Sequence, residues 1–247
     1  MSLVIRQIAR AARVRLRTAS VRTEGAERWT RIVIGGAGLF SGAALLMHIF
    51  RGGSLRASLA LTSGAAFVGA AAAWRRTPLA ARPALRRTAL VGSGVGVVAT
   101  VAYDASKAVL SRLDPSPYNP FEVLRVFGAL LAGPAASPAA RLAWGAAFHA
   151  LNGTCFGIAF CILLGRRGAV AGVAWGLGLE ICQLTLYPGW LDIRFYREFA
   201  MISSLGHVVY GLVLGIGARR FLPRPNVASS ASARHGPPPA PIGIHGS

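Results

Sequence analysis

Six polar side chains that could carry chemistry lie inside long apolar stretches of the chain. An ionisable group in such a stretch is costly unless it faces a partner, water or the interior of a helical bundle. Imidazole changes its charge near neutral pH, and a nearby carboxylate can exchange a proton with it. This combination is typical of a proton relay or an ion site. The six residues are Asp104, His149, Asn152, Glu180, Gln183 and His207.

The two histidines begin the same pattern, in which glycine follows at i+4 and i+8. The segment from His149 reads H-A-L-N-G-T-C-F-G, and the segment from His207 reads H-V-V-Y-G-L-V-L-G. Residues at this spacing share one face of a helix, and glycines on that face allow a neighbouring helix to approach closely. The pattern therefore also has a structural interpretation, in which both imidazoles form hydrogen bonds across tightly packed helices.

Three classes of function follow from these residues. The first is a structural or interaction bundle in the membrane. The second is a proton- or ion-conducting or transport protein. The third is a metal site or a membrane enzyme, since His149, His207 and Glu180 together would form a sensible ligand set for a divalent transition metal. The sequence assigns no catalytic residue and no cofactor-binding residue, and it leaves the cofactor unknown.

Two local patterns weaken the interpretations as a membrane enzyme and as an ion site. Phe148, His149 and Asn152 loosely resemble the glutamyl intramembrane proteases, but those enzymes need two adjacent glutamates followed by an arginine. Here Glu180 is single and is followed by Ile-Cys-Gln. In addition, an Asp and a Lys at i and i+3, such as Asp104 and Lys107, could simply pair with each other.

The composition assigns the chain to the membrane class. Of 247 residues, 53% are hydrophobic and only 14% are charged, whereas a soluble domain carries about 25% charged residues. The net charge is +19, but the arginines lie between and beside the apolar runs and form no separate basic domain. We therefore expect the lipid bilayer as partner and no nucleic acid.

The apolar runs predict an all-α fold, a polytopic membrane helical bundle with about six transmembrane helices in residues 29–220. Asn119, Pro120 and Glu122 also resemble the start of a helix. They predict a short interfacial helix over residues 120–132, which at about 13 residues is too short to span a bilayer. The predicted spans are residues 32–50, 57–74, 88–108, 142–165, 168–187 and 199–217.

The two terminal segments have their own predictions. In residues 1–28, Arg6, Arg10, Arg13 and Arg17 recur on one face of a helix. This pattern is typical of an interfacial amphipathic helix that binds anionic lipid, although an organelle transit peptide or a disordered basic tail fits the same composition. Residues 221–247 are rich in Pro, Ser, Ala and Gly without periodicity, which predicts a disordered tail.

The distribution of basic residues predicts the orientation of the chain. With both termini in the cytoplasm, 19 of the 27 Lys and Arg residues lie on the cytoplasmic side and 8 on the other side. This bias favours six spans with cytoplasmic termini in a cell (inner) membrane. Counted at about 1.5 Å per residue, Asp104, His149, Glu180 and His207 then share the outer half of the membrane. We expect them to converge on an interior space that opens to the outer side.

Residues 88–220 resemble the YagU-like proteins, a family of small bacterial inner-membrane proteins of unknown function. The resemblance rests on Asp104 in a Gly-rich span before a Pro-rich loop, on the span with His149, Asn152 and Gly153, and on the last span, L-G-H-V-V-Y-G-L-V-L-G. It implies a helical bundle in a bacterial inner membrane and supplies no catalytic residues. The Gly-rich helix faces also allow a homo-oligomer.

The predicted orientation can be tested with reporter domains fused after Ser116 and after Ser230. Alkaline phosphatase should be active at Ser116 and inactive at Ser230, and green fluorescent protein should give the reverse, because the arginine bias places these positions on opposite sides. Reporters that place both positions on the same side would contradict six spans with cytoplasmic termini.

Overall fold

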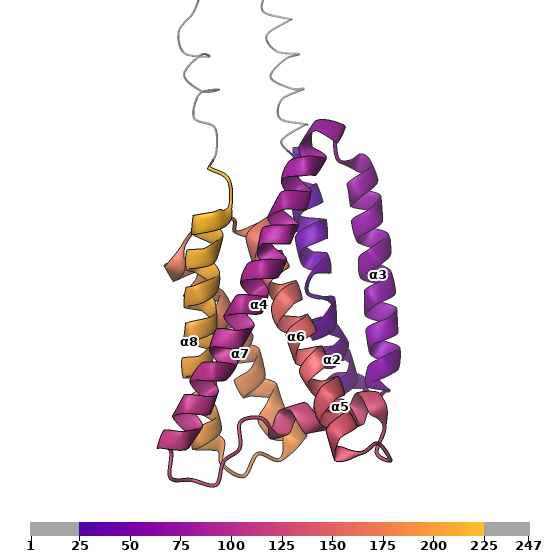
Figure 1. Cartoon of the computed structure of the whole chain (residues 1–247). Coiled ribbons are helices and arrows are strands. Elements are labelled where there is room, and N and C mark those ends of the chain that lie inside the picture. The colour runs from indigo at the N-terminus through magenta and orange to yellow at the C-terminus, as the bar shows by residue number, and fades with distance from the viewer. Residues whose placement is uncertain (1–24, 225–247) are drawn as a thin grey trace, which may run out of the picture.

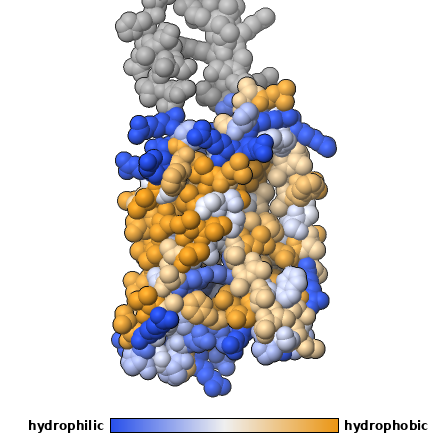
Figure 2. Space-filling view, viewed as in Figure 1, coloured by the Kyte–Doolittle hydropathy of each residue, from blue (hydrophilic) through white to orange (hydrophobic). Residues whose placement is uncertain are grey.

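The computed structural model describes residues 25–224, and these residues form a bundle of α-helices without a β-strand. Five helices are long and apolar enough to cross a membrane, and a bent pair of helices makes a sixth span if it is counted as one. A hydrophobic band separates two polar ends in Figure 2. The prediction of an all-α polytopic bundle is therefore confirmed. The predictions for residues 1–24 and for residues 225–247 lie outside the described residues.

The first predicted span is not a continuous helix. Instead, Gly25–Ala37 and α2 (Phe40–Arg51) meet at an angle of 56°. At the break, the amides of Gly38 and Leu39 donate to the carbonyls of residues three positions earlier, at 3.0 and 2.9 Å. Three closely spaced glycines favour this tight turn, because glycine weakens a regular helix.

The next helices are longer than the apolar runs that predicted them. They are α3 (Leu55–Arg76), a 3₁₀ turn η1 (Leu79–Ala81), and α4 (Arg82–Leu113). Helix α4 has 32 residues, so it is about 48 Å long and exceeds a hydrocarbon core of about 30 Å. Its first turns contain several arginines and lie outside the predicted apolar run. Pro83 does not interrupt them, because proline is compatible with the first turn of a helix.

The second half of the chain contains one short and three long helices. They are α5 (Glu122–Ala132), α6 (Pro138–Leu163), α7 (Ala169–Leu191) and α8 (Tyr196–Phe221). Helix α5 begins later than predicted because the Asn119 side chain accepts a hydrogen bond from the Phe121 amide at 3.0 Å and forms a turn. Helix α7 extends past its predicted end and stops where Asp192 adopts a left-handed backbone with φ 48°.

Helix α4 is the centre of the packing. It lies against α6 and α8, while α7 packs on α8, α5 packs on α6, and the α2–α3 hairpin lies at the side (Figure 1). Glycines make the α4–α6 contact possible. A Cβ atom on Gly157 would lie 2.5 Å from the Cα of Gly96, and a Cβ atom on Gly96 would lie 2.8 Å from the carbonyl oxygen of Gly153. The two backbones are thus in direct contact, as small residues allow in membrane helices.

A second glycine seam joins α7 to α8. A Cβ atom on Gly211 would collide with the backbone of Gly172, and one on Gly176 would collide with the backbone of His207. The glycines of both His-Gly-Gly patterns are therefore used inside this chain. A homo-oligomer stays a prediction, and these seams are not free to form it.

The two ends of the bundle differ in charge. Residues 25 and 224 lie at the same end, which we call the terminal end (Figure 1). Arg31, Arg76, Arg166 and Arg224 surround one cavity there. The opposite end, the loop end, holds the α4–α5 and α7–α8 connections.

The glycine seams can be tested by adding one methyl group. Gly157→Ala should destabilise the protein by about 1–3 kcal/mol, because the new Cβ meets the backbone of α4, which cannot move aside. Gly178→Ala is the matched control. Its Cβ meets nothing within 4 Å, so the variant should be neutral or more stable by up to about 1 kcal/mol. Thermal unfolding in detergent compares the two, and equal midpoints would contradict the seam.

Candidate functional site

A buried pair of Glu180 and His207 forms the centre of the site. Glu180 is 1% exposed, and its Oε2 lies 2.7 Å from Nδ1 of His207. The same Nδ1 lies 3.0 Å from the carbonyl oxygen of Ser203. A carboxylate and a carbonyl both accept hydrogen bonds, so Nδ1 carries the proton and donates it. In neutral His207 the other ring nitrogen, Nε2, is therefore the basic atom.

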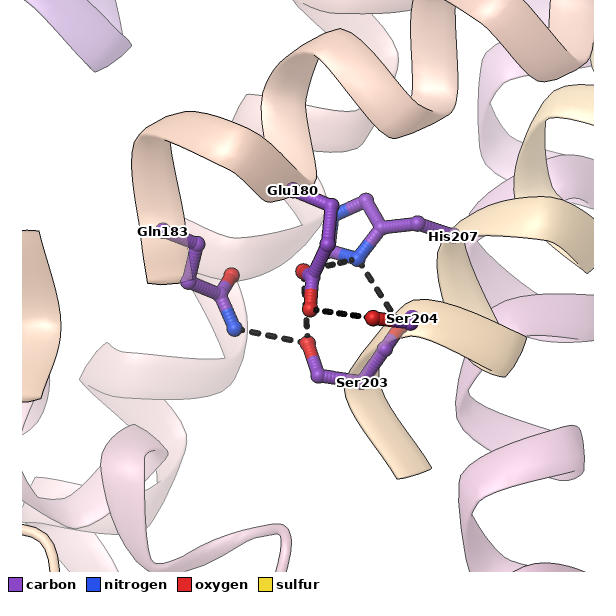
Figure 3. Close-up of polar contacts among 5 residues, drawn as sticks. All are labelled: Glu180, Gln183, Ser203, Ser204 and His207. Atoms are coloured by element: carbon purple, nitrogen blue, oxygen red, sulfur yellow. Dashed lines mark hydrogen bonds and ion pairs between the residues drawn. The ribbon is translucent and has the colours of Figure 1, made fainter. Parts of the chain in front are cut away.

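Hydroxyl groups complete the surroundings of the Glu180 carboxylate (Figure 3). Ser203 donates to Oε2 at 2.8 Å and Ser204 donates to Oε1 at 3.2 Å. Gln183, one helical turn after Glu180, donates its amide to the Ser203 hydroxyl at 2.8 Å. Helix α7 thus supplies Glu180 and Gln183, and α8 supplies the two serines and His207. The close α7–α8 seam brings these short side chains within reach of each other.

A second carboxylate–imidazole pair joins α4 to α6. Nε2 of His149 lies 3.0 Å from Oδ1 of Asp104, and both side chains are partly exposed. The ring of Tyr103 packs near both histidines, with its centroid 5.7 Å from that of His149 and 4.9 Å from that of His207. The two pairs are thus neighbours in one polar cluster. They come from four different helices.

The pairing considered for Asp104 and Lys107 does not occur. Asp104 contacts His149 instead, and no ion pair of Lys107 is present among residues 25–224. The Lys107 side chain is only 5% exposed. Its Nζ lies over the rings of Tyr103 and Phe121, at 4.7 and 5.4 Å from their centroids. The ammonium therefore contacts aromatic rings and forms no ion pair with the carboxylate one turn earlier.

A cavity of about 100 Å³, which we call the inner cavity, lies beside this cluster. Five of the six residues predicted from the sequence line it, and Glu180 lies behind His207 as its hydrogen-bonded partner. The buried Oδ1 of Asn152 has no hydrogen-bond partner within the described part of the chain, so a water in the cavity would satisfy it. The five lining residues are Asp104, His149, Asn152, Gln183 and His207.

A larger cavity of about 330 Å³, which we call the vestibule, adjoins the inner cavity at the loop end. Lys107, Val123, Gln183 and Tyr187 line both cavities. Residues from the two loops of that end, 117–120 and 192–195, form much of its wall. In Figure 2, polar residues interrupt the hydrophobic band in its lower half. The cluster is therefore reached from the loop end.

Toward the terminal end the bundle is closed by packed side chains. Ala99, Phe160 and Leu214 are fully buried there in one hydrophobic core. Two polar groups at its border are satisfied locally: Thr100 donates to the Gly96 carbonyl at 2.8 Å, and Tyr210 donates to the Gly153 carbonyl at 3.0 Å. In the described residues, the terminal side of the cluster is therefore occupied by a packed hydrophobic core.

Two groups in the α4–α5 loop have shifted pKa values. Hydrogen bonds from Ser116 lower the pKa of Asp114, and the nearby Arg197 acts in the same direction. Burial raises the pKa of Tyr118, with a smaller contribution from the negative charge of Glu180. The Tyr118 phenol is therefore neutral near pH 7 and adds no negative charge to the wall of the vestibule.

The arrangement of ligands argues against the metal hypothesis. Between residues 25 and 224, no group of three or more His, Cys, Asp or Glu side chains is placed to hold a metal ion. His149 and His207 are each engaged by a different carboxylate, and the Tyr103 ring packs against both imidazoles. The sequence could place the two histidines at one depth, but it could not show which carboxylate each one meets.

Sequence reasoning missed Tyr103, which contacts both imidazoles, and misjudged Lys107. A signal for both was present in the spacing of α4. Gly96, Thr100, Tyr103 and Lys107 recur at helical intervals, and all four are buried on the same face. A polar residue on the same helix face as a glycine was therefore a candidate for the interior of the bundle.

Comparison of the chain with models of protein families, with curated proteins and with solved structures gives no match. The resemblance to the YagU-like family stays a prediction. The fold and the site define the class: a multi-pass helical membrane protein with a cluster of carboxylates and imidazoles beside a cavity that adjoins the vestibule.

The Glu180–His207 pair can be measured with a double-mutant cycle. Glu180→Gln and His207→Gln should each destabilise the protein, and their coupling energy should be about 1–3 kcal/mol, because a buried donor and acceptor lose each other. The control pair is Glu122–Arg125, which is 3.8 Å apart and more than half exposed, so its coupling should stay below about 0.5 kcal/mol. Equal couplings from urea unfolding would contradict a buried pair.

Proposed function

We propose that the chain is a membrane protein that transports protons through its Glu180–His207 pair. The single observation that carries the proposal is the 2.7 Å contact of these two buried groups beside a cavity. An ionisable pair at depth is costly and usually marks an ion or proton pathway in membrane proteins. Both partners change charge by gaining or losing one proton, which neither glutamine nor serine can do.

The atoms of the pair support a direction for proton transfer. His207 lines the inner cavity, and its Nδ1 is committed to Glu180 and to the Ser203 carbonyl. A proton from the cavity therefore enters at Nε2 and yields an imidazolium, which the Glu180 carboxylate stabilises. Release from Nδ1 to Glu180 moves the charge one step into the α7–α8 seam.

The vestibule supports uptake of protons from the loop end. Gln183 and Ser203 line it, and both belong to the hydrogen-bonded chain that ends on Glu180. Water in the vestibule thus lies next to the chain. Because the terminal end is closed by packed side chains, passage to that side requires a change in helix packing, as in alternating access.

We further propose a bacterial inner membrane, with both termini in the cytoplasm and the vestibule on the outer side. The arginine bias supports this orientation, since Arg31, Arg76, Arg166 and Arg224 gather at the terminal end. The resemblance to the YagU-like family supports the choice of membrane. In this orientation the vestibule takes protons from outside the cell.

A second candidate is a structural bundle in which the cluster only holds helices together. It is favoured by one observation: the Glu180 carboxylate already accepts from Ser203, Ser204 and His207. A fully satisfied polar network rigidifies a bundle without moving a proton. Measurement of flux separates this candidate from the first.

The proposed function can be tested with the purified full chain in liposomes that contain a pH-sensitive dye. Under an imposed membrane potential, the wild-type protein should raise proton flux above that of empty liposomes. Glu180→Gln should reduce this flux at least about tenfold, because the amide keeps the shape but cannot carry a proton. Glu198→Gln, which removes a carboxylate in the first turn of α8 that lines neither cavity, should leave the flux unchanged.

Two results would overturn proton transport. One is a wild-type flux equal to that of empty liposomes, and the other is a flux that Glu180→Gln does not change. If Glu180→Gln then lowers stability without affecting flux, the structural bundle is the better description.

A further inference from the structure

Lys107 is a buried cation that forms no ion pair in the described part of the chain. It is 5% exposed, and its Nζ lies over the rings of Tyr103 and Phe121, at 4.7 and 5.4 Å from their centroids. A cation–π contact offsets part of the cost of burying an ammonium, but an opposite charge offsets far more of it. The side chain lines both the inner cavity and the vestibule. An anion that enters from the loop end therefore meets Lys107 at the junction of the two spaces.

We propose that the vestibule binds a small organic carboxylate, whose carboxylate group contacts Nζ of Lys107. The walls favour an apolar body on this ligand. Tyr118, Leu191, Phe195 and Phe199 line the vestibule, and such side chains bind hydrocarbon or aromatic groups. The vestibule is larger than the inner cavity, so the body lies there and the charged group points inward.

The fixed charges of the cluster limit the ligand to one negative charge. Asp104 and Glu180 are two carboxylates, and Lys107 is one cation. With both imidazoles neutral, the cluster has an excess of one negative charge and repels an anion. With both imidazoles protonated, it has an excess of one positive charge, which a monocarboxylate neutralises and a phosphate dianion exceeds.

Anion binding is therefore linked to protonation of His149 and His207, and this part of the inference rests on the proposed proton function. By linkage, an anion that prefers the protonated cluster also promotes its protonation. The affinity for the carboxylate is therefore higher when the two imidazoles carry a proton than when they are neutral.

The phenol of Tyr118 and the exposed charges at the rim of the vestibule have less effect on anion binding than the two imidazoles. Burial raises the pKa of Tyr118 in the facing loop, so this phenol stays neutral. The rim charges are exposed, and salt screens them. The charged and titratable groups that face Lys107 are Tyr103 and Asp104 of α4, Tyr118 of the loop, Glu122 of α5, His149 of α6, Glu180 and Tyr187 of α7, Asp192 and Arg194 of the α7–α8 loop, and His207 of α8.

The inference can be tested by calorimetric titration of the purified full chain in detergent with benzoate at pH 5.5 and pH 7. Benzoate stays ionised over this range, so a change in affinity reports the protein. We expect binding at least tenfold tighter at pH 5.5, and no binding of benzamide, which has the same shape without the charge.

Variants identify the cation. Lys107→Met should weaken benzoate binding at least tenfold at pH 5.5, and Lys107→Arg, which keeps the charge, should retain it. The matched control is Arg112→Met, which removes an exposed cation in the last turn of α4 that lines neither cavity, and it should change the affinity less than twofold. Thermal unfolding of each variant checks that it is folded.

Three results would overturn the inference: equal binding of benzamide, unchanged binding in a folded Lys107→Met variant, or Lys107-dependent binding of inorganic phosphate without benzoate. Failure here is distinct from failure of the proposed function. Proton flux without benzoate binding would refute only the anion site. Benzoate binding at both pH values with equal affinity, together with an absence of flux, would retain the Lys107 site but refute its link to protons.

Discussion

The structure depends on the cost of placing charged groups where water is scarce. Glu180 is almost completely buried and is held by His207 and two serines. Removing one partner of such a group leaves an uncompensated charge or an unpaired donor. These short contacts require the α7 and α8 backbones to touch, which only glycine permits at Gly172, Gly176 and Gly211. The contacts of the polar cluster therefore depend on the close helix packing that the glycines allow.

Helix α4 connects the two halves of the site. On one side, its Gly96 contacts α6, and Asp104 meets His149. On the other side, Tyr103 and Lys107 pack against Gly206 of α8. The ring of Tyr103 thus contacts both imidazoles. A movement of α4 relative to α8 would change both carboxylate–imidazole pairs together. Protonation of the cluster and packing of the helices would then be coupled.

Elements of the fold were predictable where a single physical rule dominates. Long uncharged runs predicted the long helices because an apolar run of this length buries its backbone only as a helix in lipid. Helix ends were less predictable: α4 continues through Arg86 and Arg87, and α7 continues through Pro188. The break after Ala37 was also missed, since glycine permits both a helix and a turn. For the site, depth along the spans indicated which polar residues could meet.

The sequence by itself determined the membrane class, the approximate spans and the six polar residues, because apolar composition and helical spacing are local properties of the chain. Only the tertiary structure decided the partners. It joined Glu180 to His207 and Asp104 to His149, and it left Lys107 against aromatic rings at the mouth of a cavity. The physical reason is that these contacts join different helices. Their rotation and separation are set by the glycine seams, and residue spacing along one helix does not encode them.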